Sequence, residues 1–169
     1  MEFEEAMHTN TFPTVSGKNL DRKKLTFPKD FPAPYNLALM AFYQRQQLDV
    51  NTWLPFADQL DSEHEDFTYI EFPVVYKMNP IQQFFLNEGM RAGIPNQKAR
   101  EKTITLYLDK TRFLGQLGID SQNEIQILLV TQEGQVIWRE AGIFTSKKKQ
   151  ALESILQQER QLQASNVVS

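Results

Sequence analysis

The 169-residue chain contains no cysteine. Thiol–disulfide exchange and thiol-based peroxide reduction both need a thiolate, so this chain cannot carry out either reaction. Histidine is also scarce, with His8 in a polar first segment and His64 in an acidic stretch. Two histidines so placed form no readable Ser/His/Asp arrangement and no ordered metal-ligand pattern. We therefore expect no metal and no cofactor.

Long apolar runs and basic patches are missing too. The longest apolar run, Leu37 to Tyr43, is far shorter than the roughly 20 residues of a membrane-spanning helix. The formal net charge is −3, and the one basic run, Lys147 to Lys149, is short for a nucleic-acid surface. The acidic first residues lack the apolar core of a targeting peptide. These features predict a cytoplasmic protein with neither membrane insertion nor nucleic-acid binding.

The composition is that of a globular domain, with 41% hydrophobic and 23% charged residues. A chain of this length can bury one complete core. We expect a single domain over residues 1–169, with flexible tails at 1–11 and 164–169.

Two kinds of periodicity alternate along the chain. Patterns typical of strands fall on residues 12–20, 24–27, 37–42, 67–75, 103–108, 124–131 and 135–140. Helical spacing falls on residues 50–61, 80–90, 111–117 and the segment after Thr145. Alternating strands and helices imply parallel pairing with right-handed crossovers, and the last hairpin adds antiparallel pairs. The pattern predicts an α/β fold with a central mixed sheet flanked by helices and an N-terminal strand pair.

Several residues refine this prediction. The unbroken apolar run of 37–42 is typical of an interior strand. Pro73 favours a sheet edge or strand end for 67–75, and Pro55 either kinks or starts its helix. The last helix should bury one face, formed by Ala151, Leu152, Ile155 and Leu156.

The strand at 37–42, its loop and the helix with Pro55 resemble the active-site segment of thioredoxin-like proteins. In the membrane-anchored thiol reductase and peroxiredoxin branches, such a strand leads into Cys-x-x-Cys or one reactive cysteine, and a helix proline follows. Matching Pro55 to that proline places Gln47 and Val50 where the two cysteines would stand. The resemblance implies a thioredoxin-like fold without its redox centre.

The run from Ile127 to Trp138 is similar to the closing hairpin of that family, which a cis-proline usually introduces. Counting back from Gly134 places Gln126 at the position of this proline. A cis bond before a residue other than proline costs about 2.5–4 kcal/mol. We therefore predict a trans bond between Ile125 and Gln126.

Nearly the whole chain, roughly residues 12–156, also resembles the family of the mitochondrial assembly factor for the membrane sector of ATP synthase. The matching residues are Phe12, Pro13, Gly17, Leu20, Lys24, 39–42, 53–55, 105–109, Phe113, 117–119, Gly134, Ile137, Trp138 and Gly142. This resemblance implies a role in assembly. The expected absence of a mitochondrial presequence favours a bacterial or otherwise non-imported relative.

Sites in such sheets gather at the carboxyl ends of the strands. The candidate surface for a partner or ligand there consists of Tyr43, Arg45, Gln47, Asp49, Val50, Tyr76, Ile125 and Gln126. Arg45, beside the start of a helix, is a candidate anion ligand. The simpler alternative is an ordinary surface arginine, with Asp49 as the N-cap of the helix.

Two functions remain open from the sequence. The first is a non-redox thioredoxin-fold protein that binds another protein, for example as an assembly module. The second is a small-ligand binder or non-thiol enzyme that uses the cleft near Arg45. A pocket with converging polar groups would favour the second, and an exposed flat patch the first. A structural subunit or homo-oligomer is a third alternative.

Overall fold

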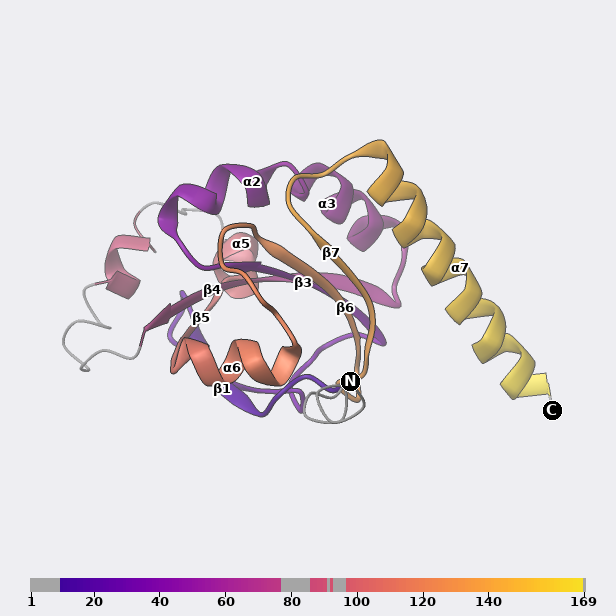
Figure 1. The fold of residues 1–169 in the computed structure, drawn as a ribbon. Helices are drawn as coiled ribbons and strands as arrows, with labels where there is room; N and C mark the ends of the chain where they lie inside the picture. The colour runs from indigo at the N-terminus through magenta and orange to yellow at the C-terminus, as the bar shows by residue number, and fades with distance from the viewer. Residues whose placement is uncertain (1–9, 77–85, 91, 93–96, 169) are drawn as a thin grey trace.

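A mixed β-sheet organises the chain (Figure 1). The structure is a computed structural model and describes residues 10–76, 86–90, 92 and 97–168. Within these ranges the sheet has seven strands in the order β2-β1-β5-β4-β3-β6-β7. The strands are β1 Val15–Asn19, β2 Lys24–Phe27, β3 Tyr35–Ala41, β4 Phe67–Tyr76, β5 Ile104–Leu108, β6 Gln126–Thr131 and β7 Val136–Ala141. The predicted α/β class and N-terminal strand pair are confirmed.

Strands β3, β4 and β5 run parallel to one another, whereas β6, β7 and the β1–β2 pair join the sheet antiparallel. β3 lies inside the sheet between β4 and β6, as its apolar run predicted. All of its residues except Ala41 are buried.

Helices cover both faces of the sheet (Figure 1). The helical segments are η1 Gln44–Gln46, α2 Gln47–Asn51, α3 Leu54–Glu63, α5 Gln97–Lys102, α6 Lys110–Leu117 and α7 Ser146–Val168, with residues 86–90 also helical. α2, α3 and α7 lie over one face and α6 over the other. No helix in the described ranges combines the length and the apolar character that a bilayer crossing requires.

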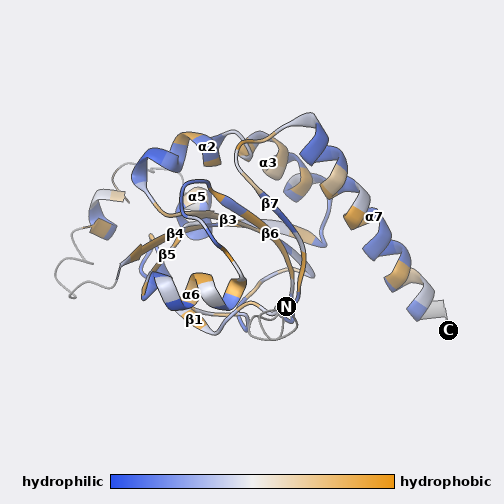
Figure 2. Cartoon of the chain, viewed as in Figure 1, coloured by the Kyte–Doolittle hydropathy of each residue, from blue (hydrophilic) through white to orange (hydrophobic). Residues whose placement is uncertain are grey.

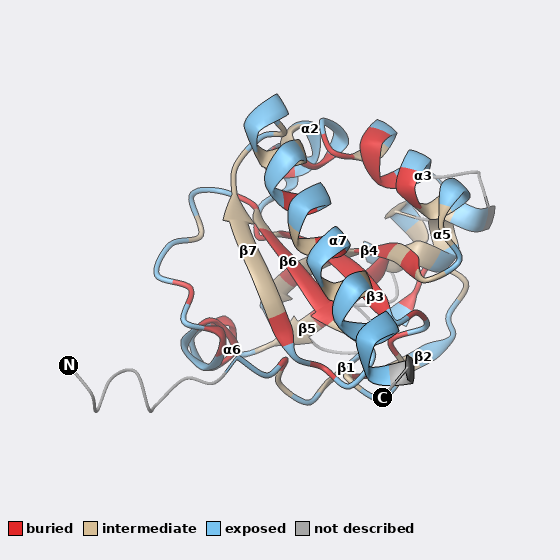
Figure 3. Ribbon diagram, turned by 90° about the vertical axis from the view of Figure 1, so that its right-hand side faces the viewer, coloured by how far each residue is buried: buried red, intermediate tan, exposed pale blue. Residues whose placement is uncertain are grey.

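Alternating residues of β3 supply two separate cores. Leu37 and Leu39 pack into the core that includes Trp53, which lies between α2 and α3, and Leu156 of α7. Ala38 and Met40 pack into the other core, together with residues of α6. The hydrophobic stretches follow the strands (Figure 2), and the centre of the sheet is buried while the outer side of α7 is exposed (Figure 3).

Two proline predictions have different outcomes. Pro55 lies in the first turn of α3, so the predicted helix over 50–61 is interrupted and restarts at this proline. The edge position suggested by Pro73 is wrong, because β4 lies between β5 and β3. Pro73 pairs with Ala41, and continuous pairing with β5 begins only at Val74. The N–H group that Pro73 lacks is therefore at a position where β4 is not yet continuously paired with β5.

Other boundaries also differ from prediction. α5 had no counterpart in the pattern analysis, and of the helix expected over 80–90 the part before residue 86 lies outside the described residues. Thr145 caps α7 through a hydrogen bond from Lys148 N at 3.2 Å, as expected. Ala151, however, is exposed rather than on the buried face.

Parts of the two predicted tails, 1–11 and 164–169, belong to regular structure. α7 continues past residue 164 to Val168. At the other end, Val136 N donates to the carbonyl oxygen of Asn10 at 2.6 Å, and Thr11 forms a β-bridge with Gln135. The hairpin therefore holds the chain from residue 10 onward. The cis peptide bond in the described ranges precedes Pro28, and the bond between Ile125 and Gln126 is trans, as predicted.

Candidate functional site

The parallel strands β3, β4 and β5 end at one edge of the sheet, which we call the carboxyl edge. Tyr43 follows β3, Tyr76 ends β4, and Lys110 begins α6 directly after β5. Arg45 belongs to η1 beside Tyr43. We call these four residues the tyrosine–cation cluster.

Cations lie over both tyrosine rings of this cluster. The Lys110 Nζ atom is 5.1 Å from the ring centroid of Tyr43 and 4.7 Å from that of Tyr76. The Arg45 guanidinium carbon is 4.5 Å from the centroid of Tyr43. These distances are within the range of favourable cation–π interactions. Lys110 thus links the ends of two strands through their aromatic rings.

Burial separates Lys110 from its aromatic neighbours. Lys110 is only 4% exposed, whereas Tyr43 is 41% and Tyr76 is 59% exposed. Its ammonium donates a hydrogen bond to the carbonyl oxygen of Phe42 at 3.0 Å, and in the described ranges it has no carboxylate partner. Burial lowers the pKa of Lys110, because removal from water disfavours the charged form. The buried ammonium of Lys110 is therefore fixed by the Phe42 carbonyl, and the two exposed tyrosine rings pack against it.

Gln46 fixes the backbone from which Tyr43 and Arg45 project. Its buried side-chain oxygen accepts hydrogen bonds from Phe42 N at 2.7 Å and Tyr43 N at 3.3 Å. Its side-chain nitrogen donates to the carbonyl oxygen of Gln122 at 2.7 Å. One amide therefore ties the end of β3 to the loop before β6. Gln46 was not among the predicted site residues, since a polar residue among polar neighbours carries no sign of burial.

The two positions matched to cysteines now have different roles. Gln47 donates hydrogen bonds to Glu71 Oε1 at 3.2 Å and Asn51 Oδ1 at 3.0 Å. Burial raises the pKa of Glu71 and the charge of Asp58 raises it further, while the hydrogen bond from Gln47 opposes both. Val50 is buried in the core. The two positions matched to the family's cysteines thus hold a surface amide, which lies beside a partly desolvated carboxyl group, and a packing residue.

The predicted surface is only partly assembled. Tyr43, Arg45 and Tyr76 come together around Lys110, a residue that was not predicted from the sequence. Val50 and Ile125 are wrong as surface residues, because both side chains are buried.

The two remaining polar candidates contribute less than expected. Asp49 lies in the first turn of α2, but Gln46 holds the N-cap position that was predicted for Asp49. Gln126 is half-buried and pairs with Met40 and Ala141 in the sheet. The exposed part of the site is therefore concentrated on the tyrosine–cation cluster and Gln47.

A cavity lies at the other end of the parallel strands, away from the tyrosine–cation cluster. This open pocket of about 880 Å³ lies between the β1–β2 turn, the start of β4 and α5. Across the described ranges, no group of three or more His, Asp or Glu side chains is arranged to hold a metal ion.

Comparison with solved structures shows that the fold is thioredoxin-like. The chain is similar to the thioredoxin domain of a thiol-disulfide oxidoreductase from Bacteroides vulgatus, with 17% identity, a TM-score of 0.55 and coverage of 86% of this chain and 94% of that one. The exposed lipoprotein thioredoxin of Streptococcus pneumoniae matches with 15% identity, a TM-score of 0.53 and coverage of 84% and 99%. BsSco, of the Sco family of cytochrome c oxidase assembly proteins, matches with 12% identity, a TM-score of 0.56 and coverage of 87% and 92%.

No protein-family model matches the chain, and no curated protein does. The resemblance to the ATP synthase assembly factor therefore stays a prediction. The cytoplasmic location stays one too, since one structural neighbour is described as an exposed lipoprotein.

Proposed function

We propose that this chain is a non-redox thioredoxin-fold protein that binds another protein through the tyrosine–cation cluster. The observation that carries the proposal is the pair of exposed tyrosines held in place by buried Lys110. Tyrosine and arginine are enriched among the residues that dominate binding energy at protein interfaces. Side chains already held by their neighbours lose less conformational entropy when a partner binds.

The surroundings of the cluster support a contact surface. Leu48, on the neighbouring helix α2, is 75% exposed and adds apolar area near the same edge. Assembly of a larger complex is the form of binding that we propose. The rival is a small-ligand site or enzyme centre at Arg45, and the cavity of about 880 Å³ lies at the other edge and gives it no support.

A co-purification experiment tests this proposal. Tagged wild-type protein, Arg45→Glu and Tyr76→Ala are used as baits in an extract of the source cells. Lys29→Glu is the matched control, since Lys29 is an exposed cation in the turn after β2, away from the carboxyl edge. We expect a partner that wild type and Lys29→Glu retain, and whose affinity falls roughly tenfold or more in the two cluster variants.

Purified partner and circular dichroism complete the test. The affinities are measured with the isolated partner, and the spectra verify that each variant is folded. Equal binding by Arg45→Glu, Tyr76→Ala and wild type would contradict the proposed surface. Failure of the wild type to retain any partner would contradict protein binding itself.

A further inference from the structure

The cavity at the amino edge of the parallel strands is a second surface with binding character. Its volume of about 880 Å³ falls in the range of roughly 300–1,000 Å³ that is usual for small-molecule sites. Leu25, Phe27 and Ile70 are among its apolar lining residues, and its charged lining residues come from the β1–β2 turn, the turn after β2, α3 and α5. A pocket of this kind can hold a compact ligand with an apolar body.

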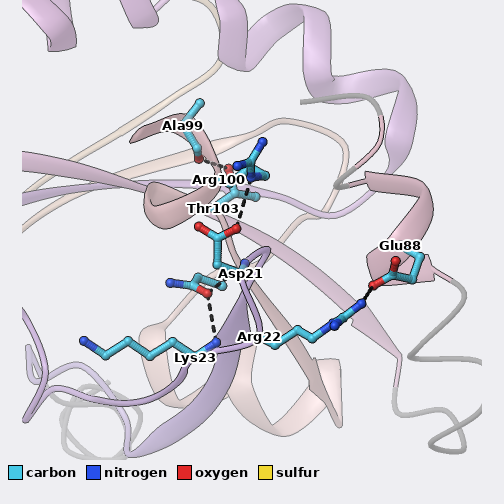
Figure 4. Close-up of polar contacts among 8 residues, drawn as sticks. Asp21, Arg22, Lys23, Glu88, Ala99, Arg100 and Thr103 are labelled. Atoms are coloured by element: carbon cyan, nitrogen blue, oxygen red, sulfur yellow. Dashed lines mark hydrogen bonds and ion pairs between the residues drawn. The ribbon is translucent and has the colours of Figure 1, made fainter. Parts of the chain in front are cut away.

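Most charges around the cavity are already neutralised by one another. Arg100 Nε donates to Asp21 Oδ1 at 3.0 Å, a contact that joins α5 to the β1–β2 turn (Figure 4). Lys102 Nζ lies 2.8 Å from Asp61 Oδ2, and Lys98 Nζ lies 3.8 Å from the same atom. These pairs hold the walls of the cavity in position, so recognition must come from other groups.

Asn19 presents an unused hydrogen-bond donor. It lines the cavity, and its exposed fraction is only 4%. The side-chain oxygen accepts from Asp21 N at 2.9 Å and Lys23 N at 3.0 Å, which fixes the orientation of the amide. The amide nitrogen donates to no atom in the described ranges. This nitrogen is not one of the fully buried polar atoms without a partner, so it keeps contact with solvent and can donate to a ligand acceptor in the cavity.

Two opposite charges in the lining also lack an ion partner. Within the described part of the chain, neither Lys23 nor Asp30 takes part in an ion pair. One carboxylate oxygen of Asp30 accepts a hydrogen bond from Thr26 N at 2.7 Å, which orients this acid without neutralising it. The cavity therefore offers one cation and one anion that are not already committed.

We propose that this cavity binds a small zwitterion with an apolar body, of the chemical class of a short apolar peptide with free termini. Its carboxylate meets Lys23 and the amide nitrogen of Asn19, and its ammonium meets Asp30. Its apolar side chains contact Leu25 and Ile70. This assignment is independent of the protein-binding surface at the carboxyl edge.

The dipeptide L-leucyl-L-leucine is a suitable probe, and calorimetry and NMR shift mapping on the full chain measure its binding. With about 17 non-hydrogen atoms and roughly 0.3 kcal/mol for each, the expected dissociation constant is on the order of 0.1–1 mM. N-acetyl-leucyl-leucine lacks the cation, and leucyl-leucine amide lacks the anion. Each should bind roughly tenfold more weakly, because one charge-assisted hydrogen bond is lost.

Substitutions distinguish the two charged contacts. Lys23→Gln should weaken dipeptide binding roughly tenfold but leave the affinity for leucyl-leucine amide unchanged. Asp30→Asn keeps an oxygen for Thr26 and should weaken binding of the dipeptide and the amide, but not of the acetylated form. Lys24→Gln is the control, since this neighbouring exposed lysine does not line the cavity.

Three results would overturn the assignment. The first is no saturable binding of the dipeptide up to about 10 mM, a concentration well above the expected dissociation constant. The second is equal affinity for the dipeptide and both single-charge analogues. The third is a set of shifts centred on the carboxyl edge instead of the β1–β2 turn and α5. Because Lys23 is exposed, Lys23→Gln can decide the carboxylate contact even if Asp30→Asn fails to fold.

Discussion

The Lys110 ammonium donates a hydrogen bond to the main-chain oxygen of Phe42 at 3.0 Å, and this contact joins the start of α6 to the end of β3. Removing the side chain in Lys110→Ala leaves a carbonyl without this donor and removes two cation–π contacts. We expect the free energy of unfolding to fall by about 2 kcal/mol. Urea denaturation followed by circular dichroism measures the change.

Arg112 is the matched control for this prediction. It is an exposed cation two positions later in α6. Arg112→Ala should change the stability by no more than about 0.5 kcal/mol. Similar losses in the two variants would mean that the Lys110 contact has no special role in stability.

Glu71 should destabilise the folded protein at neutral pH. Because burial raises its pKa, the folded state binds more protons than the unfolded state between the usual value of 4.5 and the raised value. Its contribution to stability therefore falls as pH rises through that window and stays unfavourable above it. Glu71→Gln should raise the free energy of unfolding at pH 7 by roughly 0.5–1 kcal/mol.

The pH dependence identifies the cause of that gain. Glutamine does not ionise, so the difference from wild type should shrink as the pH is lowered toward 4.5. Denaturation at a series of pH values tests this. A gain that stays constant from pH 7 to pH 4 would point to packing and not to the charge.

Gly17 allows β1 to lie close to β5. A Cβ atom at this position would be 2.5 Å from the main-chain oxygen of Thr105 and 2.9 Å from Ile104 Cγ2. The carbonyl belongs to the neighbouring strand and cannot rotate away, so Gly17→Ala should cost about 2–3 kcal/mol.

Gly115→Ala provides the opposite case. This glycine lies in α6, and an added Cβ would meet nothing within 4 Å. Because alanine favours helix over glycine, we expect a gain of about 0.5–1 kcal/mol. Thermal unfolding of both variants measures the predicted loss and the predicted gain in stability. A Gly17→Ala protein as stable as wild type would show that β1 can move away from β5.

Assays for redox activity should give no signal. The chain has no cysteine, and its methionines can only be oxidised stoichiometrically. Reduction of insulin disulfides and consumption of hydrogen peroxide should equal the rates without protein. Sustained turnover of either substrate by pure protein would refute the assignment.

The elements of the fold could largely be predicted because their signals are local. The apolar run in β3 identified an interior strand, and Gly134 with a φ of 96° marks the predicted hairpin turn. α5 was missed because Gln97–Lys102 is mostly charged and shows no apolar periodicity. Pro73 wrongly suggested an edge strand. An interior strand tolerates one missing N–H where its pairing with a neighbour is interrupted, as the pairing of β4 with β5 is before Val74.

The site was harder to predict because its contacts join distant segments. Tyr43 and Tyr76 were expected at the right edge, but Lys110, which links them, has an ordinary surface composition around it in the sequence. Only the folded sheet brings its ammonium to Phe42, 68 positions away. Val50 was misassigned because its match to a cysteine position says nothing about whether its side chain points into the core.

Strand β4 connects the two candidate surfaces, since Tyr69 lines the cavity and Tyr76 belongs to the tyrosine–cation cluster. At about 3.3 Å per residue, these positions are roughly 23 Å apart along the strand. Charges at one end are screened from the other at physiological ionic strength, where the Debye length is about 8 Å. The two ends of the molecule are thus electrostatically insulated, and either could be altered in the course of evolution while the other keeps its binding properties.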